Sequence, residues 1–203
     1  MAKISTVDYE ELPSKATAME EEAVKLNEEI SSAYESIDNM RSSWYGTRYN
    51  SLVTSFNEII STVNEMLQLV VYEIPYALRT VAYNYSVADE NAIASPEGTE
   101  PNKITEIAES TEVGLRFITS DVENIHTNVV SNFDAAIDEM NSIKSTFDTV
   151  TWESEAADAF RDKLSTLKES IESSFSDIKS QFESLMSAAE EEIEEAESSN
   201  TVS

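Results

Sequence analysis

Apolar side chains recur at alternating steps of three and four residues over four long segments of this chain, and this period limits its fold more than any other feature. The spacing places them on one face of an α-helix, where they are buried against neighbouring helices. Glycine occurs only three times and proline four times in 203 residues, so few positions interrupt the helices. The sequence therefore predicts an all-α protein built from a few long helices.

The four predicted helices fall into two pairs, and each pair is divided by a short break. The stripes of the first pair are Met19, Ala23, Leu26, Ile30, Ala33, Ile37, Met40 and Trp44, then Tyr49, Leu52, Phe56, Ile59, Val63, Leu67, Val70, Ile74, Ala77, Val81 and Tyr85. Those of the second pair are Ile118, Val122, Ile125, Val129, Phe133, Ile137, Met140 and Phe147, then Phe160, Leu164, Leu167, Ile171, Phe175, Ile178, Phe182, Leu185, Ala189 and Ile193. Pro13 fits the first turn of a helix. Pro75 lies inside the second stripe and should kink that helix locally, unless the helix ends there.

The two pairs correspond to each other along the chain. When Trp44 is aligned with Trp152, the apolar positions after the first break fall on those after the second, for example Leu52 on Phe160. Ahead of the tryptophans the match needs a shift shorter by one residue, which places Leu26 on Phe133. A shared helical period explains part of this match, but it does not explain a tryptophan at the same place in both breaks. The sequence therefore predicts two tandem helix-turn-helix hairpins that form an elongated four-helix bundle, as a pseudo-dimer.

The predicted boundaries follow from the positions of the helix breakers. The first hairpin would span residues 1–89 and the second residues 103–197. Residues 90–102 contain Pro96, Gly98 and Pro101 and are expected to form a linker. The last residues, 198–203, would be a disordered tail.

The two breaks have the composition of tight hairpin corners. Gly46 can adopt a positive φ at little steric cost, and Thr47 offers a hydroxyl to cap the following helix. Ser154 offers the same cap in the second break. Trp44 and Trp152 would either cover the end of the core or contact a partner directly, and packing at the corner is the simpler interpretation.

The charge of the chain bears on its partners. Forty acidic and 13 basic residues give a formal net charge of −27, which repels nucleic-acid phosphates and anionic lipids. We therefore expect no nucleic-acid partner and no stable membrane insertion. The acidic surface would serve solubility or meet a basic groove. The chain has no cysteine, no apolar run long enough to span a membrane and no apolar core of a cleavable Sec signal near residue 1.

Catalytic and metal-binding patterns are missing from the sequence. His126 is the only histidine, and no cysteine accompanies it, so neither a zinc site nor a pair of Glu-x-x-His motifs can be built. We also find no phosphate-binding loop and no nucleophile motif. The acidic run at residues 190–197 is expected to be a solvated helix end, although calcium or a basic surface could use it. We predict no enzymatic activity, no catalytic residue, no metal and no cofactor.

A helical hairpin of about a hundred residues with Trp-x-Gly at its corner, here Trp44 and Gly46, resembles the WxG (ESAT-like) family of type VII (ESX) secretion substrates. In that family the second helix is followed by Tyr-x-x-x-Asp/Glu, which the secretion ATPase recognises. Tyr85 and Asp89 match this motif where the second predicted helix ends. Tyr34 and Asp38 have the same spacing, but they lie in the middle of a helix, so position favours Tyr85 and Asp89. The resemblance implies secretion without a cleavable Sec signal, after folding in the cytoplasm.

The second half departs from the family pattern. Its corner carries Trp152 and Ser154 without the glycine, and Ile193 stands where Tyr85 stands in the first half. This asymmetry resembles the heterodimers of the family, in which one subunit bears the export signal. The resemblance thus implies a non-enzymatic type VII substrate or co-secreted helper that acts through helix–helix contacts. Its expected partners are the type VII secretion ATPase and either a co-secreted effector or a second copy of itself.

Two questions stay open at this stage. Family dimers place their corners at opposite ends, which would require a linker of about 15 residues, ~50 Å when extended, to pass helices that are ~60 Å long. A plain up-down-up-down bundle or exchange of hairpins between two chains would avoid that strain. For function, the alternatives are a cytosolic helical adaptor without an export role and a bundle that opens on membranes at acidic pH.

Overall fold

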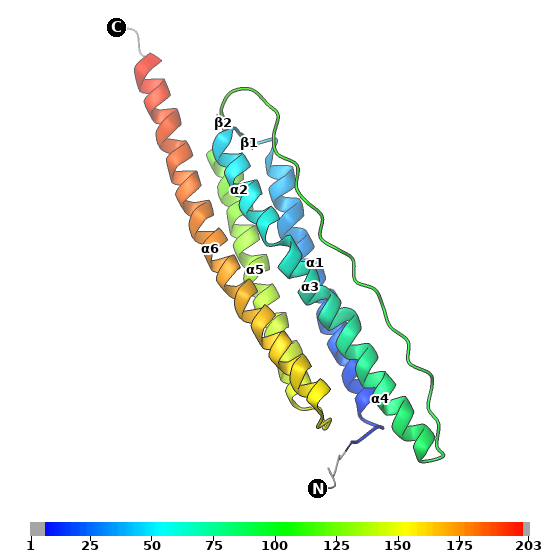
Figure 1. The fold of residues 1–203 in the computed structure, drawn as a ribbon. Coiled ribbons are helices and arrows are strands. Elements are labelled where there is room, and N and C mark those ends of the chain that lie inside the picture. The colour runs from blue at the N-terminus through cyan, green and yellow to red at the C-terminus, as the bar shows by residue number, and fades with distance from the viewer. Residues whose placement is uncertain (1–6, 201–203) are drawn as a thin grey trace.

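The computed structural model describes residues 7–200 and shows an all-α protein (Figure 1). The helices are α1 (Leu12–Met40), α2 (Thr47–Glu58), α3 (Ile60–Leu67), the π-helix η1 (Gln68–Glu73), α4 (Ile74–Ala88), α5 (Thr119–Asp148) and α6 (Glu155–Asn200). Two short strands, β1 (Trp44–Tyr45) and β2 (Arg116–Phe117), form an antiparallel pair. The all-α character that the sequence predicted is confirmed.

Helix α1 and the succession α2 to α4 run antiparallel on either side of the first predicted corner (Figure 1). Ahead of α1, Asp8 Oδ1 accepts the backbone N–H groups of Glu10 and Glu11 at 3.2 Å, and Pro13 lies in the first turn of the helix. The predicted stripe is the buried face of α1: all of its members from Met19 to Met40 have no exposed surface. The helical period thus translates directly into the core.

Pro75 does not end its helix. It lies in the first turn of α4, directly after the six-residue π-helix η1. A proline has no N–H to donate to the preceding turn, and the wider π-helical turn accommodates that missing hydrogen bond. The predicted local distortion is therefore present, as a π-helical insertion in a continuous helical path rather than as a break.

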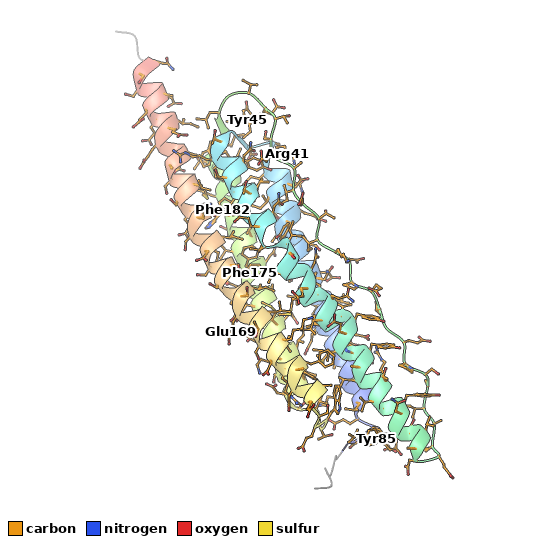
Figure 2. All side chains as sticks on the ribbon, in the orientation of Figure 1. Arg41, Tyr45, Tyr85, Glu169, Phe175 and Phe182 are labelled. Carbon is orange, nitrogen blue, oxygen red and sulfur yellow. The ribbon has the colours of Figure 1, made fainter. Side chains whose placement is uncertain are left out.

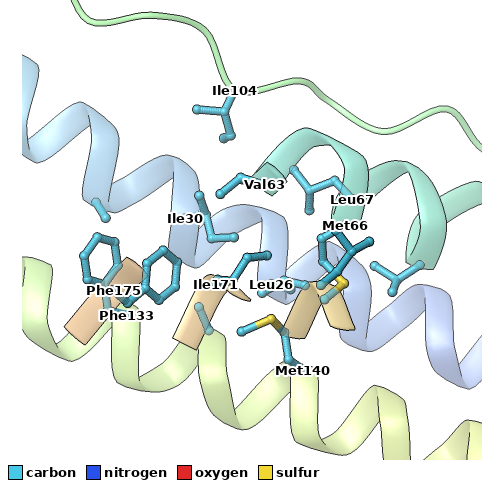
Figure 3. Close-up of a cluster of buried hydrophobic side chains, with 14 of the residues drawn as sticks. Leu26, Ile30, Val63, Met66, Leu67, Ile104, Phe133, Met140, Ile171 and Phe175 are labelled. Carbon is cyan, nitrogen blue, oxygen red and sulfur yellow. The ribbon is translucent and has the colours of Figure 1, made fainter. Parts of the chain in front are cut away.

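Helices α5 and α6 complete the core. The close-up in Figure 3 shows side chains from α1, α3, α5 and α6 meeting in one cluster, together with Ile104 from the extended connection. Phe133 of α5 stacks on Phe175 of α6, and Phe56 of α2 stacks on Phe133 at 5.6 Å between ring centroids. Burial of these aromatic rings supplies a large share of the hydrophobic stabilisation.

The two corners lie at opposite ends of the molecule. Trp44 at the first corner pairs with Phe117, just before α5 begins, and Trp152 at the second corner forms an isolated bridge with Val7, just before α1 begins (Figure 1). Each corner is thus next to the beginning of the other pair of helices. The chain therefore adopts the arrangement with its corners at opposite ends, which requires a long connection between α4 and α5.

The connection between α4 and α5 is longer than the linker that the sequence predicted. Helix α4 ends at Ala88 and α5 begins at Thr119, and the intervening chain is extended along the side of the molecule (Figure 1). Residues 103–115 are therefore extended rather than helical, whereas the predicted linker covered only 90–102. At the other end, α6 continues to Asn200, so residues 198–200 of the predicted tail are helical and residues 201–203 lie outside the described part.

Candidate functional site

The first corner buries its tryptophan between both pairs of helices. Trp44 has no exposed surface, and its ring contacts Tyr49, Phe117 and Phe182 at centroid separations of 6.3, 5.2 and 6.0 Å. Phe117 precedes α5 and Phe182 belongs to α6, so this one ring links the two pairs. Of the two interpretations considered for Trp44, corner packing agrees with this burial.

Gly46 has the backbone conformation that its residue type suggested. Its φ is +120°, and a Cβ atom placed there would lie 3.3 Å from the carbonyl oxygen of Gly114 in the extended connection. The glycine therefore permits both the turn and the close approach of the connection. The capping role predicted for Thr47 is wrong: Gly46 occupies the N-cap, no side chain caps α2, and Thr47 is the first helical residue.

The second corner is closed by different contacts. Ser154 Oγ accepts the backbone N–H of Ala157 at 3.1 Å, which confirms the predicted cap of α6. Trp152 is 7% exposed, and its carbonyl oxygen accepts a hydrogen bond from Arg161 at 3.4 Å. Arg161 also donates to the carbonyl oxygen of Val150. These side-chain contacts hold a corner that lacks the glycine.

Tyr85 lies in the last turn of α4, at the tip of the first hairpin (Figure 2). Asp89 is the C-cap residue of the same helix. The Tyr85 side chain is 39% exposed, and Asp89 is also exposed. The backbone N–H of Asp89 donates to the carbonyl oxygen of Tyr85 at 3.0 Å, so the two residues share the last helical turn. A partner protein can reach an aromatic ring and a carboxylate side by side.

The N-terminal segment contacts this tip. The hydroxyl of Tyr9 donates a hydrogen bond of 2.5 Å to Asp89 Oδ2. This hydrogen bond raises the pKa of Tyr9 above its usual range, because loss of the proton would leave two anions in contact. Asp89 is thus available at the surface but already has one protein partner.

The other Tyr-x-x-x-Asp match differs in accessibility. Tyr34 is only 5% exposed, its hydroxyl donates to the carbonyl oxygen of Phe56 at 2.6 Å, and its ring packs edge-on against Phe56. Asp38 forms an ion pair with Arg41. A partner could not reach the Tyr34 ring without opening the core, whereas the Tyr85 ring is partly exposed.

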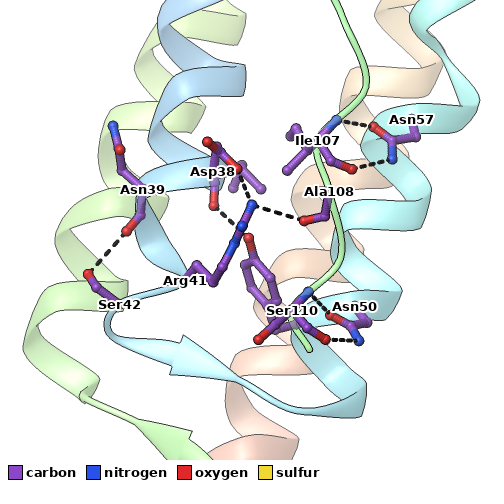
Figure 4. A network of polar contacts seen from close by, with 11 residues as sticks. Asp38, Asn39, Arg41, Ser42, Asn50, Asn57, Ile107, Ala108 and Ser110 are labelled. Carbon is purple, nitrogen blue, oxygen red and sulfur yellow. Dashed lines mark hydrogen bonds and ion pairs between the residues drawn. The ribbon is translucent and has the colours of Figure 1, made fainter. Parts of the chain in front are cut away.

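A ladder of asparagines, which the sequence analysis missed, holds the extended connection in place; Figure 4 shows two of its three members, Asn50 and Asn57. Asn64, Asn57 and Asn50 each form two hydrogen bonds with the backbone of one extended residue: Ile104, Ile107 and Ser110, respectively, at 2.8 to 3.1 Å. The sequence contained one signal for this ladder: the three asparagines are seven residues apart, which places them on one helical face.

On the side opposite the asparagine ladder, Asn27 of α1 and Arg41, the C-cap residue of α1, contact the extended connection. Asn27 Nδ2 donates to the carbonyl oxygen of Asn102 at 2.7 Å, and Arg41 donates to that of Ala108 at 3.0 Å. We call residues 102–110 the strap, and we call the channel lined by Asn27, Arg41, Asn50, Asn57 and Asn64 the ladder groove. Every one of these five side chains binds a main-chain group of the strap.

The acidic end of α6 has one defined contact with the first corner. Arg48 donates to Glu192 Oε1 at 2.5 Å, and this ion pair lowers the pKa of Glu192. Residues 194–200 are exposed, and Ile193 is half-buried. The exposure of these residues agrees with the predicted solvated helix end, and α6 stays helical up to Asn200.

His126 of α5 packs against α6. The His126 ring packs edge-on against Phe182 at 4.9 Å, and its Nε2 lies 3.9 Å from a Glu183 oxygen. Within residues 7–200, no three histidine, aspartate or glutamate side chains converge as a metal site would require. Over the same residues, none of the helices has the length and apolar character of a membrane span.

The fold and the site define an elongated all-α protein with an aromatic–acidic pair at one helix tip and a strap along its side. Comparison of the chain with protein-family models, with curated proteins and with solved structures finds no match in any of the three. The likeness to the WxG family therefore depends on the residues themselves, on Trp44 and Gly46 at the first corner and on Tyr85 and Asp89 at the tip of α4.

Proposed function

We propose that the protein is a non-enzymatic type VII (ESX) secretion substrate or co-secreted helper, exported by way of Tyr85 and Asp89. The observation that carries this proposal is their placement on the exposed last turn of α4, at the end of a hairpin whose corner is Trp44 and Gly46. An exposed ring beside a carboxylate at a helix end suits recognition by another protein, here the secretion ATPase.

In this proposal the second pair of helices is a built-in partner of the first. The chain is then a pseudo-dimer of two hairpins in one four-helix bundle, and only the first hairpin carries the signal. Two features support it: the corners lie at opposite ends, and Trp44 packs against Phe117 and Phe182 of the second half. Covalent connection keeps the second hairpin at a high effective concentration, so no partner has to be found before export.

The test is export from the native host with and without its type VII ATPase. We expect ATPase-dependent release of the native chain and no release of the Tyr85→Ala/Asp89→Ala variant, with both measured as full-length protein in supernatant and lysate. Val87→Ala/Glu90→Gln is the matched control, because both residues are exposed at the same tip but lie outside the motif. Tyr9→Phe removes the hydrogen bond to Asp89 and leaves the motif intact.

The outcomes separate the proposal from its alternative. Export that survives the double substitution removes the role of Tyr85 and Asp89. If the native chain stays in the cell while the ATPase exports other substrates, the resemblance is architectural and a cytosolic adaptor is the better description. Loss of export by the Val87/Glu90 control as well would mean that the whole tip, rather than the motif, is required.

A further inference from the structure

We infer that the ladder groove is a binding site for extended polypeptide, able to accept a partner's segment in trans when the strap leaves it. The ligand class is an unfolded or extended peptide with aliphatic side chains at two positions three residues apart and a small polar residue three positions later. This inference goes beyond the export proposal and does not depend on it.

The contacts show recognition of the main chain. A carboxamide carries one acceptor and a pair of donor hydrogens, and so it can pair with the N–H and C=O of one residue as a neighbouring strand would. Asn57 does this with Ile107, donating and accepting at 2.9 Å in both directions. Asn64 and Asn50 repeat the arrangement on Ile104 and Ser110. Such contacts are available to any extended chain, whatever its sequence.

The spacing of the ladder fits an extended chain. Asparagines seven residues apart on a helix lie ~10.5 Å apart along its axis. Three residues of polyproline-II-like chain span ~9.3 Å. The two repeats therefore stay in register over the two steps between the three sites, with the strap running antiparallel to α2 and α3. Asn50, Asn57 and Asn64 thus present a preformed series of sites rather than three unrelated contacts.

Side-chain selectivity comes from every third residue of the strap. Ile104, Ile107 and Ser110 are 7%, 6% and 8% exposed. All four strap residues between them are exposed: Thr105, Glu106, Ala108 and Glu109. The ladder groove therefore selects side chains at only three positions, and a partner segment needs to share only those with the strap.

The second half of the chain offers no equivalent groove. The residues that align with the three asparagines there are Asp158, Ser165 and Glu172. A carboxylate cannot donate to a carbonyl oxygen, and a serine hydroxyl cannot satisfy both groups of a peptide unit as a carboxamide does. The ladder is thus a property of the first hairpin alone. The groove matches the long extended connection between α4 and α5.

The first experiment opens the groove in the full-length chain. Ile104→Ser/Ile107→Ser removes the two aliphatic anchors of the strap and leaves the ladder groove unchanged. A fluorescent peptide of residues 101–112 is then titrated and followed by anisotropy. We expect saturable binding to this variant and at least tenfold weaker binding to the native chain, whose own strap competes at an effective concentration of about millimolar.

Matched controls connect binding to the ladder. Adding Asn57→Ala to the opened variant should weaken the peptide about thirtyfold, as expected for two hydrogen bonds of ordinary net strength. Asn141→Ala, an exposed asparagine of α5, should leave the affinity unchanged. A peptide of the same composition with its isoleucines adjacent should bind at least tenfold more weakly. No binding to an opened variant with native helical circular dichroism, or equal binding of both peptides, overturns the inference.

A second measurement keeps the native strap sequence, in case the opened variant fails to fold. Site-specific protease sequences are placed at Glu100 and at Val113, which is 96% exposed, and the folded chain is cut at both. We expect the excised strap to co-elute with the protein in gel filtration and to exchange with labelled peptide. Immediate loss of the strap without uptake of the peptide contradicts the inference. Light scattering that shows a dimer of the uncut native chain would instead assign the groove to strap exchange between copies.

Discussion

Truncation of the two corner tryptophans should have unequal effects on stability. The residues occupy equivalent positions in the sequence, but Trp44 is fully buried and contacts three aromatic rings. Trp152 is 7% exposed and, within residues 7–200, contacts one aromatic ring, that of Phe160, at 6.2 Å. We therefore expect Trp44→Ala to lower the free energy of unfolding more than Trp152→Ala does.

The size of the difference follows from these contacts. Replacing a buried tryptophan by alanine costs about 3–5 kcal/mol. Each aromatic pair adds about 0.5–1.5 kcal/mol beyond the buried area. Trp44 has two more pairs than Trp152, so the difference between the variants should be about 1–3 kcal/mol. Both of those additional pairs belong to the second half of the chain.

The assay is urea unfolding followed by circular dichroism at 222 nm, with the m-value compared between variants. Trp44→Phe is a milder third variant that keeps an aromatic ring and removes the indole Nε1, a buried donor without a hydrogen-bond partner. It should cost less than about 2 kcal/mol, because removal of an unsatisfied donor offsets part of the lost packing. Equal costs for the two alanine variants, or a larger cost for Trp152→Ala, would refute the assignment of Trp44 as the link between the halves.

Three further predictions concern caps, backbone conformation and pH. Ser154→Ala should lower the free energy of unfolding by about 1 kcal/mol, whereas Thr47→Ala should change it by less than about 0.5 kcal/mol; equal effects in urea unfolding would contradict the observed caps. Gly46→Ala should lower the melting temperature more than Gly114→Ala, since both have positive φ but only Gly46 would bring a Cβ atom within 3.3 Å of another residue. Burial raises the pKa of Glu22. The folded state therefore favours the protonated form, and this contribution to stability is lost as the pH rises above the ordinary glutamate pKa. Glu22→Gln should thus raise the melting temperature at pH 7 and change it less at pH 4; an unchanged melting temperature at pH 7 would contradict this.

Much of the helical architecture could be predicted because its causes are local. The three-and-four spacing from Met19 to Met40 became the buried face of α1, and Ser154 became the cap of α6. Thr47 was a wrong prediction, since a threonine next to a helix start can be N-cap or first helical residue. Gly46 takes the N-cap position in the structure, so Thr47 becomes the first helical residue.

The strap could not be predicted from its own residues. Residues 103–115 contain apolar positions but neither a sustained helical period nor a strand alternation, and their conformation is set by asparagines 40 to 60 residues away in the chain. The asparagine spacing was visible in the sequence. However, a carboxamide on a helix surface has no assigned partner until the fold brings one to it.

The sequence by itself determined that the chain is all-α, where its two corners lie and which faces of its helices are buried, because helical period, glycine conformation and capping act over a few residues. Only the tertiary structure decided that the corners stand at opposite ends, that Trp44 joins the two halves and that the connection lies extended in the ladder groove. These features depend on contacts between segments distant in sequence, whose free energies no local pattern specifies.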